Sequence, residues 1–532
     1  MASSRRQGGD ALGSWLSWAA ITATYVALRL NVVDVPLDRD EGTFGLIGRT
    51  ILEGGVPYRD AIDHKPPLVF FLYSLALLVF PPTARGLHVF LHLYNFATLV
   101  VLYFVARRLF GVAAGRWTAF VFAVVSSGSA VQGFTLSTEM LLLLPLSASL
   151  LLALGCADGE TSAASLAASG ACAALACWIK QPAVLLALFV LGTAALLLHA
   201  RGVSRLVAGL GAWAAGGLAV CAAVIGYFAA NGVLGEFLYW CFVHGALYST
   251  EQSYLDHLSR TGAHLWEVVK GSPAVLAAAV LFPLCLRRRA LPGPTIAAAF
   301  LVVALAMIPL GFVYRHYFAV LCPPIALVCG AGLAEATGRI AGVGARWATA
   351  ACLGLVLAAG QVVADPGYYV SDSREDISHE LFAGNPFVLA EEIAHFLAED
   401  GSPDDRVLIF GSEPEILLLS GLESATAFTV VYPLMREVYP RHREFQERLM
   451  QETATEPPDY ILFVDIQMSL LWDGKATLEA RSTLQDVAAR DYEPLRTWLR
   501  EPGMAQWAGV EGPLTGRARG TRVIRLFRRR SG

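Results

Sequence analysis

Charged residues are scarce in this sequence. Only 16% of its 532 residues are charged and 55% are hydrophobic, whereas a soluble globular chain carries roughly 25% charged residues. The deficit is concentrated in residues 1–364, which run as long stretches of Ala, Leu and Val. The net charge of −4, with no basic face, argues against a nucleic-acid partner. The composition therefore predicts an integral membrane protein.

Cysteine is absent from the polar segments. All nine cysteines lie between Cys156 and Cys352, inside apolar stretches. This arrangement excludes a disulfide framework and shows no zinc-ligand spacing, so we interpret these cysteines as apolar helix residues. Arg5 and Arg6 precede the first apolar run, but that run is too long for a signal peptide and lacks a cleavage site. We therefore expect it to be retained as a helix.

Apolar runs of about 20 residues predict membrane-spanning helices. We expect eleven of them, at 12–33, 86–106, 115–132, 140–156, 163–179, 182–200, 207–229, 272–286, 294–313, 316–334 and 347–364. The Ala-rich stretch 160–177 is biased towards tightly packed helices. A further stretch, 67–81, is short and flanked by proline pairs. It suits a segment lying along the membrane surface better than a span.

The basic residues fix the orientation, because cytoplasmic loops are enriched in Lys and Arg. With 67–81 not crossing, the cytoplasmic side receives Arg5, Arg6, Arg107, Arg108, Arg116, Arg201, Arg205, Arg287, Arg288, Arg289, Arg339 and Arg346. The expected location is the inner (plasma) membrane, with several passes and a cytoplasmic N-terminus. The long first loop, 34–85, then lies on the extracytoplasmic side, as do 133–139, the turn at Lys180, 230–271 and the turn at Tyr314.

We expect two domains, a transmembrane domain at 1–364 and a soluble extracytoplasmic α/β domain at 365–532. The second is charged and has no spanning run. Its short apolar runs predict strands and its amphipathic stretches predict helices. The expected strands are Arg406–Gly411, Ala427–Val431, Asp459–Asp465 and Arg522–Phe527, and the expected helices are Phe387–Glu399 and Met435–Gln451. The fold class is thus mainly α, with a carboxyl-terminal α/β domain.

The first outer loop carries most of the chemistry. Its acidic residues, clustered at a membrane boundary, are Asp34, Asp38, Asp40, Glu41, Asp60 and Asp63. Ordinary boundary charges would also fit this loop, but anionic lipids would repel such a cluster, which favours a functional role for Asp40 and Glu41. Further along, Lys65 is followed by Pro66 and Pro67, which fix the backbone beside it.

Transfer of a sugar from a phosphate carrier to a hydroxyl would use such groups. The reaction passes through an oxocarbenium-like state, and a carboxylate such as Asp40 can take the proton from the attacking hydroxyl. The departing phosphate gathers negative charge that cations stabilise. Lys65 and Arg315, both on the outer side in the predicted orientation, are the expected donor-phosphate ligands, Arg as a bidentate group and Lys as a point charge.

Other residues on the predicted outer side could line the same cleft. They are His64, Glu139, Lys180, His244, His316 and Tyr317. Each also has a plain structural explanation. Glu139 complements a helix dipole, Lys180 fits a side chain that snorkels to the interface, and the aromatic group around His244 fits an interfacial belt. The histidines and Glu139 could bind a divalent metal, but no spacing among them is diagnostic, so no metal ligand and no cofactor is assigned.

Several segments resemble the family 39 glycosyltransferases, bacterial relatives of protein O-mannosyltransferases and of the lipid A aminoarabinose transferase. The resemblance rests on Asp40-Glu41-Gly42, the turn 54–58, His64–Leu68, Thr138-Glu139 and His316-Tyr317 with the later Pro323-Pro324. It covers roughly residues 10–335 and implies the C-type membrane fold. It also implies that Asp40 is the catalytic base and that Glu41 orients the acceptor. Lys65 and Arg315 are then the residues that contact the carrier phosphate.

The expected function is therefore transfer of a sugar, with inversion, from a polyprenyl-phosphate donor to an acceptor hydroxyl outside the cytoplasm. The acceptor is left open between glycan, lipid and protein, and membrane lipids are the other expected partners. A polytopic flippase for lipid-linked glycans is the main alternative, although transporters place charge at the midplane and show related halves, which this sequence lacks. A scaffold that presents 365–532, or a glycan polymerase, is a further alternative.

Overall fold

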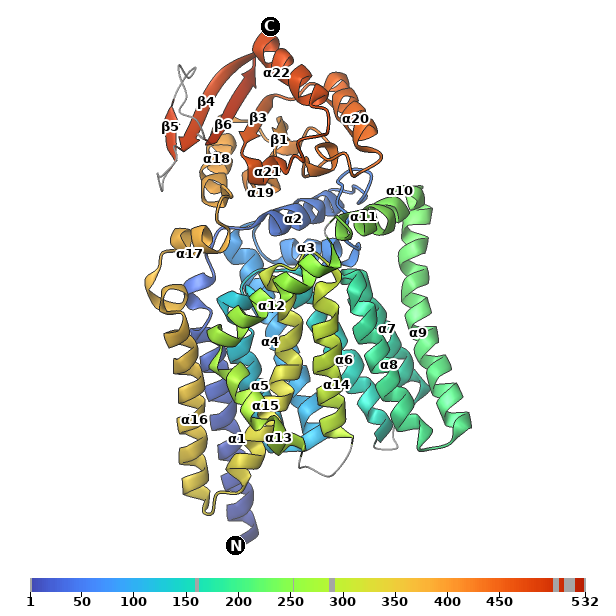
Figure 1. Ribbon diagram of the computed structural model, residues 1–532, viewed down its shortest axis with the longest axis vertical. Helices are drawn as coiled ribbons and strands as arrows, with labels where there is room; N and C mark the ends of the chain where they lie inside the picture. The colour runs from blue at the N-terminus through green and yellow to red at the C-terminus, as the bar shows by residue number, and fades with distance from the viewer. Residues whose placement is uncertain are drawn as a thin grey trace. The chain divides into compact units, whose positions relative to one another are not determined.

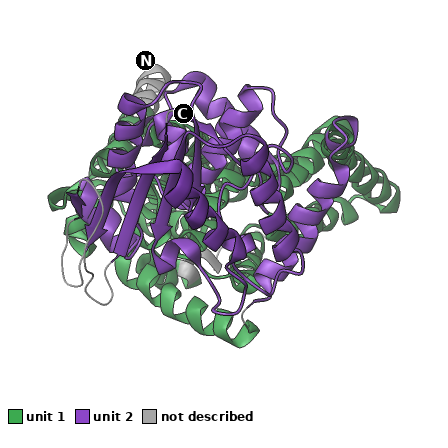
Figure 2. Cartoon of the chain, turned by 90° about the horizontal axis from the view of Figure 1, so that it is seen from above, with its two compact units in different colours: residues 1–34, 88–227, 252–373 green, residues 35–87, 228–251, 374–532 purple. Residues whose placement is uncertain are grey.

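The computed structural model describes residues 2–157, 162–251, 253–286, 292–500, 507–510 and 522–530. The predicted cytoplasmic cluster Arg287–Arg289 lies outside these residues. The chain forms two compact units, coloured separately in Figure 2. We call Met1–Asp34, His88–Tyr227 and Gln252–Ser373 the helical unit, and Val35–Leu87, Phe228–Glu251 and Arg374–Gly532 the α/β unit.

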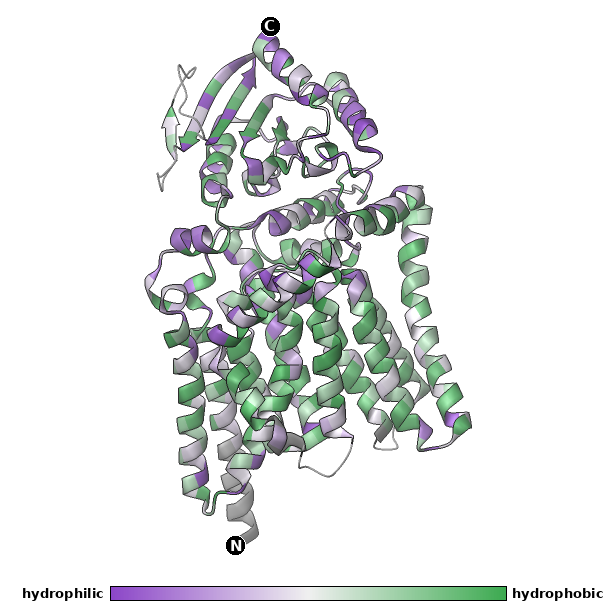
Figure 3. Ribbon diagram, viewed as in Figure 1, coloured by the Kyte–Doolittle hydropathy of each residue, from purple (hydrophilic) through white to green (hydrophobic). Residues whose placement is uncertain are grey.

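The helical unit consists of helices, most of them long and apolar (Figures 1 and 3). In chain order these are α1 (Ala2–Ala27), α4 (Ala84–Phe110), α5 (Val112–Val125), α6 (Thr138–Leu154), α7 (Ala163–Ile179), α8 (Val184–His199), α9 (Val203–Ala230), α12 (Tyr254–Gly271), α13 (Pro273–Leu286), α14 (Gly293–Met307), α15 (Cys322–Gly338) and α16 (Val343–Ala364). Each predicted span falls on one of these helices. Among the described residues, six helices are long and apolar enough to cross a membrane. The mainly helical membrane fold is thus confirmed, while the count of eleven spans stays a prediction.

Helix α15 is the most deeply buried of the six long apolar helices among the described residues, and every residue from Cys322 to Ala334 is buried. It packs against α5 and α13, and α6 packs against α7. Small residues allow such close approach. A Cβ at Gly170 of α7 would stand 1.8 Å from the carbonyl oxygen of Trp213 in α9. This agrees with the tight packing expected for the Ala-rich stretch.

Helix α12 was not predicted, because its segment was interpreted as part of an outer loop. Ser253 caps its amino terminus by accepting from the Asp256 backbone N–H, and His257 and Val268 form its buried side. Leu255 and Trp266 stay exposed on the other side. Polar residues at the remaining positions broke the apolar run that a spanning helix would need.

The α/β unit contains a sheet with strand order β2-β1-β3-β6-β4-β5. The strands are β1 (Arg406–Phe410), β2 (Glu423–Ser424), β3 (Tyr460–Asp465), β4 (Tyr492–Arg500), β5 (Ala508–Val510) and β6 (Arg522–Arg529). Strand β1 pairs in parallel with β2 and β3, and the remaining neighbours pair antiparallel. Continuous apolar runs in β1 and β3 agree with burial on both faces.

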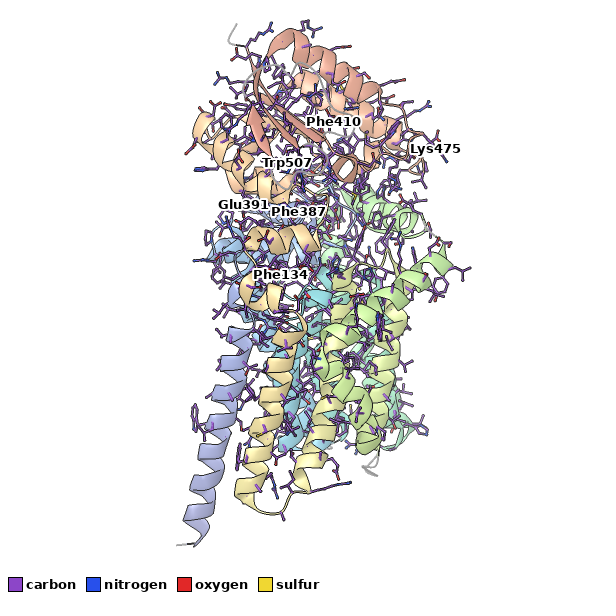
Figure 4. All side chains as sticks on the ribbon, turned by 60° about the vertical axis from the view of Figure 1, so that its left-hand side comes forward. Phe134, Phe387, Glu391, Phe410, Lys475 and Trp507 are labelled. Carbon is purple, nitrogen blue, oxygen red and sulfur yellow. The ribbon has the colours of Figure 1, made fainter. Side chains whose placement is uncertain are left out.

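The core of this unit joins the sheet to helices from distant parts of the chain. Leu397 of α18 (Phe387–Asp400) packs with Leu462 of β3 and with Leu46 of α2 (Arg39–Leu52), a helix of the first loop. In Figure 4, Phe410 marks the end of β1 in the interior, whereas the exposed Lys475 lies on the outside. Helix α3 (Leu68–Val79) packs against α2, and Ser74 of α3 donates to the Gly48 carbonyl at 2.9 Å.

Two predicted elements of the α/β unit differ from the structure. Residues 427–431 do not join the sheet, because β1 pairs earlier, at Glu423–Ser424, and Phe428 bridges to Ile62. Helix α20 spans His442–Thr455 and begins after the predicted Met435, because Pro440 disfavours helical backbone in the residue before it. The division at 364/365 followed composition and stays a prediction, and the compact units divide the chain differently.

Candidate functional site

The acidic start of the first loop forms the amino terminus of α2. Asp38 is the N-cap, and its Oδ1 accepts from the Glu41 backbone N–H at 2.9 Å. In return, Glu41 Oε2 accepts from the Asp38 backbone N–H at 3.2 Å. This reciprocal capping box satisfies two helix-end donors and uses both buried carboxylates. Burial raises the pKa of Asp38 well above its usual range, and the neighbouring Glu41 and Asp40 raise it further.

Asp40 differs from its two neighbours. Its carboxylate makes no hydrogen bond or ion pair with another described residue, and it is partly exposed. Asp40 acts electrostatically on Asp63 and on Tyr432, so these groups lie near each other within the α/β unit. Asp40 is therefore the carboxylate of this cluster that the local structure leaves available for chemistry.

A tight turn holds Lys65. Tyr58 has a left-handed backbone with φ of 69° and is completely buried. Its hydroxyl donates to the Lys65 carbonyl at 2.7 Å, and the Lys65 backbone N–H donates to Asp63 Oδ1 at 2.8 Å. The Lys65 ammonium lies 5.7 Å from the ring centroid of Tyr248, within the range of a cation–π contact.

Asp63 and His64 lie beside this lysine. Burial raises the pKa of Asp63 to about 6, with Lys65 opposing the shift and Asp40 adding to it. His64 Nδ1 lies 3.7 Å from Asp63 Oδ2 and 2.8 Å from the Tyr432 hydroxyl. The imidazole also packs on Tyr248, with ring centroids 4.5 Å apart.

His244 lies in the same aromatic cluster and is fully buried. Its ring packs at a tilt against Trp240 and against Tyr439, with centroid distances of 4.7 and 4.2 Å. Neither ring nitrogen has a hydrogen-bond partner among the described residues, and burial lowers the pKa of His244 to about 3. His244 is therefore neutral and packed among aromatic rings. Its expected place in the cleft and the alternative of an interfacial aromatic belt both stay predictions.

A second cluster lies in the helical unit. Ser137 caps α6, and Glu139 in its first turn accepts from the Lys180 ammonium. The Lys180 Nζ lies 3.4 Å from the ring centroid of Tyr317. Both charged residues are buried, Glu139 to 1% exposure and Lys180 to 7%. A buried, hydrogen-bonded ion pair is costly to break, because either partner alone becomes an uncompensated charge. Lys180 is thus not a snorkelling side chain.

His316 and Arg315 border this pair. His316 Nε2 lies 3.9 Å from Glu139 Oε2, and its Nδ1 lies 3.0 Å from the Gln132 side-chain oxygen. Gln132 adopts a left-handed backbone with φ of 48°. Arg315 is half-buried and makes no hydrogen bond or ion pair with another described residue, although its charge acts on His264. It is a cation without a carboxylate partner in the described part of this unit.

The predicted site residues therefore fall into two groups. Asp40, Glu41, His64, Lys65 and His244 lie in the α/β unit. Glu139, Lys180, Arg315, His316 and Tyr317 lie in the helical unit. Their common cleft stays a prediction, as do the individual roles. Within the described ranges, no three His, Cys, Asp or Glu side chains are arranged to hold a metal ion.

The sequence did not point to Tyr432, Tyr439 or Gln132. The two tyrosines belong to the carboxyl-terminal part, far along the chain from His64 and His244. Gln132 was counted inside a spanning helix, whereas α5 ends at Val125. The positive φ of Gln132 has no sequence signal, because glutamine is not a residue typical of that conformation.

Comparisons with known proteins bear on the fold and the family. Residues 64–227 match the family model described as dolichyl-phosphate-mannose-protein mannosyltransferase. The fold is similar to the crystal structure of ArnT from Cupriavidus metallidurans in the apo state, with a TM-score of 0.58 and 15% identity over 97% of this chain and 98% of that chain. The structure of the same enzyme bound to undecaprenyl phosphate gives a TM-score of 0.57 and 14% identity, covering 96% and 97%. No curated protein matched.

These findings confirm the resemblance expected from the sequence. A stretch of the chain matches a C-type glycosyltransferase family, and nearly the whole chain has the fold of a C-type enzyme that was crystallised with a polyprenyl phosphate.

Proposed function

We propose that this protein transfers a sugar from a polyprenyl-phosphate carrier to an acceptor hydroxyl on the extracytoplasmic side of the membrane, with inversion at the anomeric carbon. The observation that carries the proposal is the state of Asp40. Capping of α2 occupies Asp38 and Glu41, while the Asp40 carboxylate has no hydrogen-bond or ion-pair partner among the described residues. It is partly exposed and acts electrostatically on Asp63 of the Asp63–Lys65 turn.

In the proposed reaction, Asp40 accepts the proton of the acceptor hydroxyl as that oxygen attacks the anomeric carbon. The bond from the anomeric carbon to the phosphate oxygen breaks, and the polyprenyl phosphate leaves with the electron pair. Attack from the face opposite the phosphate inverts the carbon. Lys65 and Arg315 are proposed to stabilise the charge that develops on the phosphate. Arg315 suits this role because no carboxylate among the described residues neutralises it.

The other predicted residues have supporting parts in this proposal. Glu41 acts by fixing the amino terminus of α2, so that Asp40 is presented from a capped helix. His64, His244, Glu139, Lys180, His316 and Tyr317 line the cleft. The ion pair of Glu139 with Lys180 is already satisfied, so we assign it to shaping the cleft rather than to binding phosphate.

Because cytoplasmic loops are enriched in basic residues, we expect the protein to cross the inner membrane several times with its amino terminus in the cytoplasm. Donor and acceptor then meet outside the cytoplasm. The ArnT structure with undecaprenyl phosphate supports a carrier of that chemical class.

The test uses the full-length protein purified in detergent or in liposomes. It is incubated with a panel of radiolabelled polyprenyl-phosphate sugars, and label is followed into lipid, glycan and protein fractions. We expect one donor to lose label to an acceptor fraction. Labelled lipid that moves across the liposome bilayer without transfer for any sugar would instead identify a flippase and refute the proposal.

A further inference from the structure

The first loop and the carboxyl-terminal part of the chain form one compact unit (Figure 2). Part of their contact is backbone pairing. The Ile62 N–H donates to the Ala427 carbonyl at 2.8 Å, and the Thr429 hydroxyl donates to the Ile62 carbonyl at 2.8 Å. Residues 427–429 thus run alongside the chain that leads into His64 and Lys65. A soluble domain that acted independently would not need this pairing.

This backbone pairing places Tyr432 beside His64. Three residues beyond Thr429, its hydroxyl reaches His64 Nδ1 at 2.8 Å. Both side chains are buried, Tyr432 to 7% and His64 to 8% exposure. Burial, together with Tyr439, Asp63 and Asp40, raises the pKa of Tyr432 well above its usual range. The phenol therefore stays neutral.

A neutral phenol keeps its proton and can donate it in a hydrogen bond to His64. When its O–H donates to Nδ1 of His64, the imidazole is the tautomer that carries its proton on Nε2. His64 precedes Lys65 directly, and both the backbone N–H and the carbonyl of Lys65 are already held, by Asp63 and Tyr58. Tyr432 adds a hold on the His64 side chain from the carboxyl-terminal part.

A second attachment lies at the other end of the loop. The Arg39 guanidinium donates to the carbonyls of Ser412 and Met468 at 2.7 and 2.8 Å. Arg39 directly precedes Asp40. The two groups assigned to base and phosphate chemistry, Asp40 and Lys65, therefore each follow a residue that is anchored to the carboxyl-terminal part.

We propose that Tyr432 is a positioning residue of the transfer site, which holds His64 and through it Lys65, and that residues 374–532 are consequently a structural component of that site. This inference rests on the proposed function. The carboxyl-terminal part then contributes to binding of the donor and needs no separate binding activity.

The test compares Tyr432→Phe with Tyr492→Phe in the full-length protein. Each substitution removes one phenolic hydroxyl from the same unit. The Tyr492 hydroxyl donates to the Pro458 carbonyl at 2.6 Å, and it makes no hydrogen bond with a described residue of the first loop. Tyr492→Phe therefore controls for general loss of stability.

Two quantities are measured. The first is hydrogen exchange of peptides that cover residues 57–66, which needs no substrate. The second is the split between KM for the polyprenyl-phosphate sugar and kcat. We expect faster exchange of 57–66 in Tyr432→Phe alone, and a KM raised about 5- to 30-fold, the factor that loss of one or two kcal/mol produces, with kcat little changed.

Equal exchange in the two variants overturns the inference, and so does a lowered kcat with unchanged KM. If Tyr432→Phe unfolds, His64→Ala is measured in its place, because it removes the other partner of the same hydrogen bond. Wild-type exchange of 57–66 and a wild-type KM in that variant also overturn the inference. A wild-type protein that uses no donor refutes the proposed function, whereas the exchange result still decides whether Tyr432 holds the loop.

Discussion

Replacement of Asp40 by Asn is the sharpest test of the proposed base. Asparagine has nearly the same shape, and the Asp40 carboxylate makes no hydrogen bond or ion pair with another described residue that the change would break. The residue stands in the first turn of α2, where a negative charge is stabilising by about 0.3–1 kcal/mol. Asp40→Asn should therefore lower the free energy of unfolding by no more than about 1 kcal/mol.

The effect on catalysis should be much larger. A positioned general base contributes roughly 100- to 10,000-fold to a rate, which at 1.36 kcal/mol per factor of ten is about 3–5 kcal/mol of activation free energy. The loss should appear in kcat, because the asparagine leaves Lys65 and the aromatic cluster in place. KM for the donor should stay within a few-fold of the wild-type value. Removing the Asp40 charge also takes away one of the influences that raise the pKa of Asp63.

The assay follows transfer of labelled sugar at saturating donor, alongside thermal unfolding of the same preparation. Glu53→Gln is the matched control, since it neutralises a carboxylate at the carboxyl-terminal end of the same helix, where the side chain is largely exposed. We expect near wild-type turnover in the control. Turnover of Asp40→Asn within twofold of wild type, in folded protein, would remove Asp40 from the role of base.

Four further outcomes are expected. Lys65→Ala should raise KM for the donor about tenfold or more with a smaller change in kcat, and unchanged donor dependence in steady-state kinetics would exclude Lys65 from the phosphate site. Glu139→Gln alone and Lys180→Met alone should each lower the free energy of unfolding by about 3–5 kcal/mol, as measured by denaturant unfolding in detergent. The double variant should lose clearly less than the sum of the two, and additive losses would contradict a coupled pair. Gly42→Ala should lower the free energy of unfolding by about 1–3 kcal/mol, because its Cβ would stand 2.5 Å from a backbone nitrogen of α19 (Pro414–Ser420). An unchanged melting temperature would argue against that packing. Because the folded-state pKa of Asp63 is raised from 3.8 to about 6, the folded state binds the extra proton. Stability should therefore fall by roughly 3 kcal/mol as pH rises from about 4 to 6, and Asp63→Asn should abolish that slope in melting curves.

Much of the helical unit could be predicted from sequence. Each predicted span falls on a helix, and α7 has the predicted bounds, Ala163–Ile179. The reason is that lipid-facing helices must satisfy their own backbone and stay apolar over their whole length, which leaves a strong signal in the sequence. Helix α12 was missed because an amphipathic helix has no continuous apolar run.

The candidate site could be predicted only in part. Asp40 and Lys65 lie in the first loop, where motif and spacing carry the information. The pairing of His64 with Tyr432 could not be foreseen, because nothing in the local sequence of either residue specifies a partner on another segment. The same holds for Lys180 and Glu139, whose separate local explanations were each plausible until the structure joined them in a buried pair.

By itself, the sequence determined the membrane class, the positions of the apolar helices and the cluster of acidic and basic residues in the first loop. These depend on composition and on short-range periodicity. Only the tertiary structure decided that the carboxyl-terminal α/β part packs on the first loop, and that Tyr432 meets His64. Such choices depend on burial and on hydrogen bonds between segments hundreds of residues apart, which local patterns do not encode.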